Sequence, residues 1–255
     1  GVKGLLNIQF AIKDDTLFIL EANPRASRTM PFVSKVTGNQ IIKAGTLLML
    51  GHSLDSIKKT SNYLNSSTNK IAIKKAIFPW SRFPAEDTML GPEMKATGEV
   101  LGIGRSFGVA LNKAYAAAGV EINENEKGIF VSLSDQEKPN FIKIVKTYSD
   151  LGFKIYSTYG TGEYLKNNDI NSTIVGRADE TFPTSLTILQ DKLISLVINT
   201  PTFANEYTDG WKIRRLSHET GVAVVSSVRE AEAFLKAFLE TTKSFEDMEA
   251  IQNVS

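Results

Sequence analysis

The second half of the chain alternates short apolar runs with amphipathic segments, and this alternation restricts the fold more than any other feature of the sequence. It begins at Lys127, and short polar connections separate the segments. Strand–helix alternation with short connections is typical of a parallel sheet covered by helices on both faces. We expect strands at 128–133, 153–157, 173–176, 193–198 and 222–225, and helices at 137–150, 161–167, 184–190, 208–220 and 227–239.

Composition limits the classes of function that remain. The chain has 255 residues, of which 42% are hydrophobic, enough for one large domain or two modest ones. The net charge of +1 provides no basic surface for nucleic acid or an anionic membrane. The absence of cysteine excludes disulfides and thiolate metal sites and fits the reducing cytoplasm, where we expect the protein. No apolar run reaches the roughly 20 residues of a membrane-spanning helix. The opening GVKGLLNIQF enters a strand at once, so we expect a fragment of something longer.

The first residues predict a β-hairpin with one polar face. Apolar and polar residues alternate over 5–13, and a second run, 17–23, follows the turn signal Asp14-Asp15. If the even-numbered apolar residues of both runs share a face, the hairpin loop must contain an odd number of residues. Those of the second run are Phe18, Leu20 and Ala22. The opposite face then gathers Gln9, Glu21 and Asn23.

The remaining segments before Lys127 are shorter. We expect a helix at 39–50 ending at Gly51, a loop or mobile connection at 58–70, a strand at 71–78 stopped by Pro79, a helix at 106–118 capped by Ser106, and a polar linker at 119–126. The tail from Thr241 is polar, and we expect it to be frayed.

The polar face of the hairpin has the composition of a metal–phosphate site. One carboxylate, Glu21, and two amides, Gln9 and Asn23, form a hard-oxygen set suited to Mg²⁺ bound to nucleotide phosphates. Arg25 and Arg28 follow closely, and guanidinium groups bind phosphate or carboxylate bidentately. The alternative is a solvent-facing strand whose Asn23-Pro24 step makes an ordinary turn.

The runs EANPRASRTMPFVSKVTG (21–38) and FPWSRFPAEDTMLGPEMKATGEVLGIGRSFGVA (78–110), together with Gln9, closely resemble the carbamoyl-phosphate synthetase large subunit. They look like the end of its second ATP-grasp unit, which phosphorylates carbamate. A biotin carboxylase shares a similar E-x-N-P-R, but it continues with a glutamate- and histidine-containing segment. Here Ala26-Ser27-Arg28-Thr29 follows, which favours the synthetase.

The resemblance implies a role for each polar residue of the hairpin. Gln9, Glu21 and Asn23 would hold Mg²⁺ or Mn²⁺, with Gln9 and Glu21 nearest to ATP, and Arg25 and Arg28 would stabilise the carbamate-derived phosphoryl group. The implied parent is a ligase that makes carbamoyl phosphate with a glutaminase small subunit in a hetero-oligomer, for pyrimidine or arginine synthesis. Because ATP-grasp catalysis also needs an upstream lobe, we expect the chain alone to be inactive.

A second set of polar residues follows the strands of the second half. Ser157-Thr158-Tyr159-Gly160-Thr161 lies between a predicted strand and a helix, where free N–H groups and the helix dipole favour a phosphate. A simple helix cap explains the motif about equally well. Lys138 and Arg177 could add positive charge. Asn199 and Thr200 would end a strand, at the edge where open parallel sheets bind ligands.

This half resembles the methylglyoxal-synthase-like regulatory domain that ends the synthetase large subunit. In nucleotide-regulated members the domain binds UMP or IMP, and the matching positions here are Ser132, Lys138, Thr158, Thr161, Arg177, Asn199 and Thr200. Arg177 replaces a usual lysine, and Pro201 stands where threonine is common in enteric members. In the first half, Lys74-Lys75-Ala76 replaces a "VKEV"-like strand, so we do not expect ornithine activation of that kind.

The fold expected from both resemblances is α/β, with a partial ATP-grasp (α+β) domain followed by a doubly wound parallel-sheet methylglyoxal-synthase-like domain. The expected boundaries are 1–118 for the ATP-grasp portion, 119–126 for the linker and 127–255 for the allosteric domain. A non-catalytic module that only senses nucleotides is the alternative function. Methylglyoxal synthase chemistry is disfavoured, because the VINTP segment (197–201) lacks the expected Asp-Pro pairing.

Several other residues have a structural interpretation. We expect no metal site at His52 and His218, which lack paired carboxylates, and we expect Trp80 and Trp211 to pack rather than to stack on a ligand. Arg214 and Arg215 are consistent with solvated charge on a helix face or with an interface, and we favour solvated charge.

Overall fold

The computed structural model describes residues 1–60, 63–64, 69–80, 83, 88, 94–120, 128–177, 180, 183–200 and 208–241, and of Thr60 only the backbone. The chain divides into two compact units, Gly1–Ala72 and Ile73–Ser255. The expected linker at 119–126 lies largely outside the described residues, so it stays a prediction, and so does the expected fraying of the tail beyond Thr241. None of the helices in the described ranges is long and apolar enough to cross a membrane.

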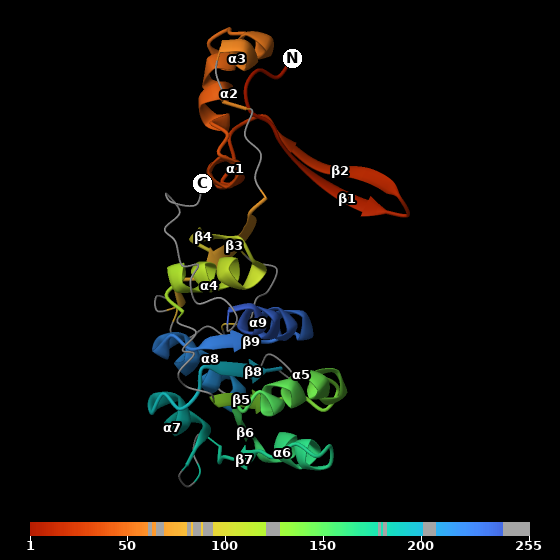
Figure 1. Ribbon diagram of the computed structural model, residues 1–255, viewed down its shortest axis with the longest axis vertical. Coiled ribbons are helices and arrows are strands. Elements are labelled where there is room, and N and C mark those ends of the chain that lie inside the picture. Colours follow the sequence, from red (N-terminus) through yellow and green to blue (C-terminus); the bar gives the residue numbers. More distant parts are fainter. Residues whose placement is uncertain are drawn as a thin grey trace. The chain divides into compact units, whose positions relative to one another are not determined.

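The described residues of the first unit form a hairpin and three short helices (Figure 1). The predicted hairpin and the helix predicted at 39–50 are present. Helices at 29–37 and 54–60 were not predicted, and the second of them is a correction, because it occupies the start of the expected loop at 58–70. The elements are β1 (Asn7–Lys13), β2 (Thr16–Asn23), α1 (Thr29–Thr37), α2 (Ile41–Met49) and α3 (Leu54–Thr60).

The hairpin corrects the predicted loop length but confirms that Gln9 and Glu21 share a face. Lys13 pairs with Thr16, so the loop has two residues rather than an odd number. Asp14 and Asp15 both have positive φ, 48° and 56°. Two-residue hairpin turns need such values at both positions, because the twist of the turn then matches the twist of the strands. The register then shifts between Gln9 and Phe10, where a β-bulge in β2 adds one residue and brings Gln9 opposite Glu21.

The bulge changes which residues share a face. Phe18 pairs with Ala11, so it lies on the face of Gln9 and not on the apolar face expected for it. Leu17 and Ile19 pair with Ile12 and Phe10 instead. The apolar side chains of the hairpin remain exposed within this unit, with between 48% and 75% of their surface accessible: Phe10, Ile12, Leu17, Phe18, Ile19 and Leu20.

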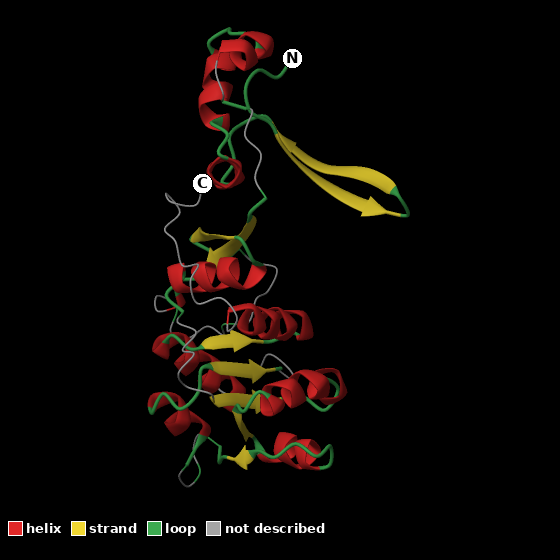
Figure 2. Ribbon diagram, in the orientation of Figure 1, coloured by secondary structure: helices red, strands yellow, loops and turns green. Residues whose placement is uncertain are grey.

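The second unit is built on the predicted parallel sheet, with strand order β7-β6-β5-β8-β9 (Figure 2). Every strand and helix expected in this half is present, with ends shifted by a few residues. The strands are β5 (Gly128–Ser132), β6 (Lys154–Ser157), β7 (Thr173–Ile174), β8 (Leu196–Asn199) and β9 (Ala223–Val225). The helices are α5 (Lys138–Asp150), α6 (Tyr159–Lys166), α7 (Ser185–Gln190), α8 (Asp209–Thr220) and α9 (Val228–Thr241).

Both faces of this sheet are buried, as expected for strands that read as continuous apolar runs. Alternate residues of β5 point into two separate cores. Ile129 and Val131 pack beneath α5 and α9, whereas Phe130 packs beneath α7 and α8.

A smaller strand pair and a helix precede the sheet in this unit. They are β3 (Ile71–Ile77), β4 (Gly98–Gly104), which was not predicted, and α4 (Phe107–Ala117). Ser106 caps α4 as expected, because its hydroxyl accepts a hydrogen bond from the Val109 amide at 3.3 Å. α4 packs on α9, where the rings of Tyr115 and Phe234 meet edge to face with centroids 4.6 Å apart.

The expectation of solvated charge at Arg214 and Arg215 is wrong, because both arginines are buried, with relative exposures of 3% and 7%. The Arg215 guanidinium donates hydrogen bonds of 2.9 Å to the carbonyl oxygens of Trp80 and Phe83. Trp80 is buried against Phe78, which agrees with its expected packing role. The buried guanidinium is stable here because hydrogen bonds to protein oxygens replace those that it would make to water.

His218 lies against the same cluster, with its ring centroid 6.0 Å from that of Trp80. Burial, together with the positive charges of Lys75 and Arg215, lowers the pKa of His218 to about 4. The imidazole is therefore neutral at neutral pH, where it avoids adding a third cation to the cluster.

We expect replacement of Gly102 by alanine to destabilise the protein. A Cβ at Gly102 would overlap the carbonyl oxygen of Ala110, whereas a Cβ at Gly98, in the same strand, would have no neighbour within 4 Å. Gly102→Ala should reduce the free energy of unfolding by at least about 2 kcal/mol, and Gly98→Ala should change it by less than about 0.5 kcal/mol. Urea denaturation measures both, and equal stability of the two variants would contradict this packing.

We expect the protein to lose stability as the pH falls from 6.5 toward 4. In this window the unfolded chain binds a proton at His218 that the folded protein excludes, so protonation favours unfolding. The free energy of unfolding should fall by about 2 kcal/mol through this group. His218→Gln should flatten that part of the pH profile. An unchanged profile in His218→Gln would contradict the assignment.

Candidate functional site

The strongest candidate site is a cavity of about 960 Å³ at the carboxyl-terminal edge of the five-stranded sheet. Its walls come from the residues that follow β5, β6, β7 and β8, together with the start of α8. β5 is the central strand, and the chain leaves it toward β6 on one side and reaches β8 on the other. Ligands of open parallel sheets bind at such a switch point, because the two connections diverge and leave a crevice.

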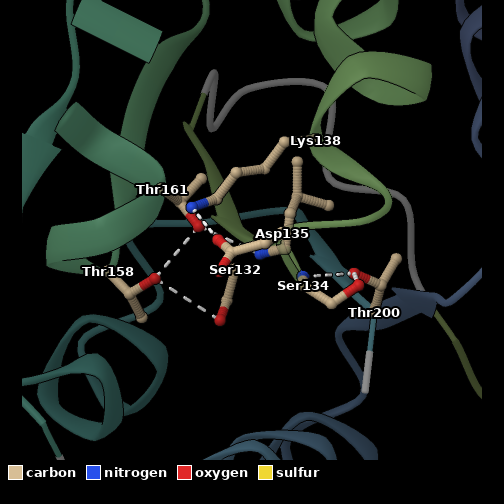
Figure 3. A network of polar contacts seen from close by, with 8 residues as sticks. Ser132, Ser134, Asp135, Lys138, Thr158, Thr161 and Thr200 are labelled. Atoms are coloured by element: carbon tan, nitrogen blue, oxygen red, sulfur yellow. Dashed lines mark hydrogen bonds and ion pairs between the residues drawn. The ribbon is translucent and has the colours of Figure 1, made fainter. Parts of the chain in front are cut away.

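Three hydroxyl groups hold the loop that follows β5 (Figure 3). The Thr161 hydroxyl accepts a hydrogen bond from the Leu133 amide at 3.0 Å, and the Thr200 hydroxyl accepts one from the Ser134 amide at 2.8 Å. Thr158 donates to the Thr161 hydroxyl at 3.2 Å. The amides of this loop are therefore satisfied by side chains from α6 and from the residue after β8 rather than by water.

Thr158 stands at the N-cap of α6 but does not cap it through its side chain. Its hydroxyl is hydrogen-bonded to Thr161, so a simple helix cap does not account for the motif. Tyr159 and Gly160 line the cavity. The first amides of a helix have no intrahelical acceptor, and the positive end of the helix dipole lies at the same place. The start of α6 is thus an anion-binding element with a hydroxyl beside it.

Basic side chains approach the cavity from three directions. Lys138 opens α5, and its ammonium is 3.8 Å from the position of a Cβ at Gly160. Arg177 lies after β7, with 73% of its side chain exposed, and its Nε is 3.9 Å from an Asp209 carboxylate oxygen. Arg214, on α8, donates a 2.6 Å hydrogen bond to the Asn199 side-chain oxygen. An anionic ligand would therefore enter a region that already contains positively and negatively charged side chains.

The structure gathers all seven residues predicted for the nucleotide site. Five line the cavity directly: Ser132, Thr158, Arg177, Asn199 and Thr200. Thr161 lies behind Thr158, and Lys138 lies beside Gly160. Their contact with a nucleotide stays a prediction.

Sequence reasoning missed two residues of this region, Arg214 and Asp135. Arg214 lines the cavity, and Gly210, one turn earlier on α8, leaves space for its guanidinium, since a Cβ there would be 3.1 Å from Nη1. A glycine at the start of an otherwise regular helix was the sequence signal that a side chain packs closely there. Asp135 pairs with Lys138 at 2.5 Å, and its i,i+3 spacing from the lysine was the signal for it.

The polar residues of the N-terminal hairpin form a second, separate candidate site. Gln9 lies directly opposite Glu21, and the Asn23 amide donates a 2.7 Å hydrogen bond to the Glu21 carboxylate. Arg25 donates through its guanidinium to the Ala26 carbonyl at 3.1 Å, and Arg28 immediately precedes α1. These five side chains are thus close in the chain, and the three proposed metal ligands share one face of the hairpin.

The donor chemistry of this face fits a divalent cation of the magnesium type, since it offers one carboxylate and two amides. Asn23 turns its NH₂ group to Glu21, so both residues can bind one ion only after the amide rotates. Within the part of the chain that the structure describes, no three histidine, aspartate or glutamate side chains gather to hold a metal.

Comparison with known proteins gives a different family model for each half of the chain. The model of the MGS-like domain matches residues 140–226, and the model of the carbamoyl-phosphate synthase L chain, ATP binding domain, matches residues 1–57. A protein of Aquifex aeolicus described as carbamoyl phosphate synthase large chain, C-terminal section, is 38% identical over 259 residues. The carbamoyl phosphate synthase large chains of Brucella suis and Methanocorpusculum labreanum are 41% and 40% identical over 244 residues each.

Over most of its length the chain is similar to carbamoyl phosphate synthase large chains. The Aquifex match covers 96% of this chain and 48% of the relative, and the Brucella and Methanocorpusculum matches cover 92% and 96% of this chain but only 21% and 23% of the relatives. The chain therefore spans about half of one large-chain relative and less than a quarter of the others. The predicted resemblance and fold class are confirmed: a partial ATP-grasp region precedes an MGS-like domain.

Proposed function

We propose that the chain contributes two parts to a carbamoyl-phosphate synthetase, a ligase that makes carbamoyl phosphate from bicarbonate, glutamine-derived ammonia and ATP. The N-terminal hairpin supplies ligands for ATP phosphates and for Mg²⁺ or Mn²⁺ in the carbamate-phosphorylating step. The MGS-like domain senses a nucleoside monophosphate such as UMP or IMP. The partners are the remainder of the large subunit and a glutaminase small subunit, in a cytoplasmic hetero-oligomer.

The cavity beyond β5 and β8 is the observation that carries the regulatory part. It combines the start of α6, the Thr158 hydroxyl and the nearby Lys138 ammonium, which suit a phosphate group. Its volume of about 960 Å³ leaves room for a sugar and a base beside the phosphate. Asn199 lines the same cavity, with its amide fixed by Arg214, and offers a directional contact to the rest of the ligand.

The pairing of Gln9 with Glu21 supports the catalytic part. When bound, the metal would neutralise charge on the phosphates during transfer. Gln9, Glu21 and Asn23 would hold it, and Arg25 and Arg28 would bind the oxygens of the transferred group and keep it oriented. The match of residues 1–57 to an ATP-binding domain model agrees with this assignment.

A purely regulatory role is the second candidate. The residues that line the cavity all belong to Ile73–Ser255, which forms a compact unit by itself, so nucleotide binding does not require the hairpin. Methylglyoxal synthase chemistry has less support. Asn199 and Thr200 occupy the strand end where an aspartate followed by a proline would be expected for that reaction.

We expect UMP to stabilise the chain through its phosphate. At millimolar concentration UMP should raise the melting temperature by at least about 2 °C, the shift for roughly 1 kcal/mol of binding linkage. Uridine, which lacks the phosphate, should have little effect. Thr158→Val keeps the side-chain volume and removes the cavity hydroxyl, so it should reduce the UMP shift. Thr147→Val removes a hydroxyl that is bonded within α5 and should retain the full shift.

Differential scanning fluorimetry measures these shifts. Thr158 is preferable to Thr161 as the substituted residue, because Thr161 holds the Leu133 amide and its loss would also disturb the loop. Equal stabilisation by UMP and uridine, or no stabilisation by any nucleoside monophosphate, would count against the sensor.

We expect the 255-residue chain alone to form no carbamoyl phosphate from carbamate and MgATP. The hairpin provides one wall of a phosphate site, and phosphoryl transfer needs groups that surround the nucleotide on all sides. A coupled assay that converts carbamoyl phosphate to citrulline tests this. Turnover above that of an Arg25→Ala/Arg28→Ala variant would contradict it.

A further inference from the structure

Lys138 is a buried cation whose partner is an exposed anion. The lysine side chain is 11% exposed, and its ammonium is 2.5 Å from an Asp135 carboxylate oxygen (Figure 3). The Asp135 side chain is 92% exposed. A buried ammonium needs a negative partner to offset the loss of water, whereas an exposed carboxylate is well solvated without one. The ion pair therefore stabilises the buried Lys138 ammonium more than it stabilises the exposed Asp135 carboxylate.

The position of the ammonium shows what else could serve as its partner. Lys138 Nζ lies 3.8 Å from the position of a Cβ at Gly160, beside the start of α6, and 5.8 Å from the centre of the Tyr164 ring. Gly160 lines the cavity. A phosphate held at the start of α6 would thus be within reach of the same ammonium that Asp135 contacts.

A second acidic residue paired with a cavity cation, Asp209, is less suited to exchange. Asp209 is 3.9 Å from Arg177, and both side chains are more exposed than Lys138. Exposed pairs at this distance contribute little. Asp209 also lies 3.9 Å from Lys212 and in the first turn of α8, where a carboxylate stabilises the helix. It therefore has structural roles that would keep it in place.

We infer that Asp135 is an internal counter-ion, which neutralises Lys138 while the cavity is empty and is displaced by the phosphate of the ligand. This inference rests on the proposed nucleotide site and specifies how that site is regulated. On binding, the Lys138–Asp135 ion pair breaks, a Lys138–phosphate ion pair forms, and the Asp135 carboxylate moves into water. Ligand affinity is reduced by the free energy of the pair that is lost.

The inference predicts opposite effects of one substitution on the empty and the occupied protein. Asp135→Asn leaves Lys138 without its counter-ion when the cavity is empty, so the empty protein should have a lower melting temperature. With phosphate bound, Lys138 again has a negative partner. The dissociation constant should therefore fall, by about tenfold for one partly buried ion pair. A residue that only stabilised the loop would weaken binding when removed.

Isothermal titration calorimetry of the full chain with UMP and with inorganic phosphate tests the inference. Asp150→Asn is the matched control, because it removes the same charge from α5, where Asp150 lies 3.8 Å from Lys146 in an exposed pair. It should leave both the melting temperature and the dissociation constant unchanged. Asp135→Glu keeps the charge and should bind close to the wild-type value.

The outcomes separate this inference from the proposed function. If the wild type binds UMP and Asp135→Asn binds with equal or lower affinity, the counter-ion role is overturned and the nucleotide site stands. If the wild type binds neither UMP nor phosphate, both are overturned. Should Asp135→Asn fail to fold, Asp135→Ser gives the same comparison, and tighter binding than Asp135→Glu supports the inference.

Discussion

The hydrogen bonds that fix the loop after β5 are the interactions on which the cavity depends. β5 is the central strand, and its last residue, Ser132, is followed by two amides, those of Leu133 and Ser134, that bond to side chains. Thr161 from α6 and Thr200 after β8 accept these hydrogen bonds, so three connections that are distant in the chain hold one another in place. These hydrogen bonds give the loop one conformation, so the loop forms a wall of defined shape for the cavity.

The two adjacent arginines of α8 show how one helix serves both the cavity and the core. Consecutive helical residues point about 100° apart, so Arg214 and Arg215 face different neighbours. Arg214 orients the Asn199 amide at the cavity, and Arg215 binds the carbonyl oxygens of Trp80 and Phe83. Each guanidinium is buried with hydrogen-bond acceptors, which explains why two neighbouring positive charges are tolerated away from water.

The second half of the fold was predictable because its local signals agree with each other. Apolar runs, glycines and caps all place β5 to α9 within a few residues of their observed ends. Even the cavity residues follow from the rule that ligands bind at strand ends, as Asn199 and Thr200 illustrate. Arg214 and Arg215 could not be placed in the same way, because a charged residue on a helix is usually exposed, and only tertiary contacts show that these are not.

The first half was less predictable for reasons of backbone geometry. β4 contains three glycines, so it lacks the β-branched pattern that marks a strand, and close packing against α4 rather than propensity determines its conformation. The shared face of Gln9 and Glu21 was predicted correctly but for the wrong reason. Strict alternation predicts an odd loop, whereas the chain combines a two-residue turn with a bulge, and side-chain periodicity does not reveal a bulge.

That combination links two distant points of the hairpin. The turn at Asp14-Asp15 and the extra residue of β2 each change the parity of the pairing, and together they restore it at the polar end. Loss or gain of a single residue at the turn would invert one strand relative to the other and separate Gln9 from Glu21. A length change there can be accommodated only with a compensating change at the bulge, so evolution must alter the two positions jointly or not at all.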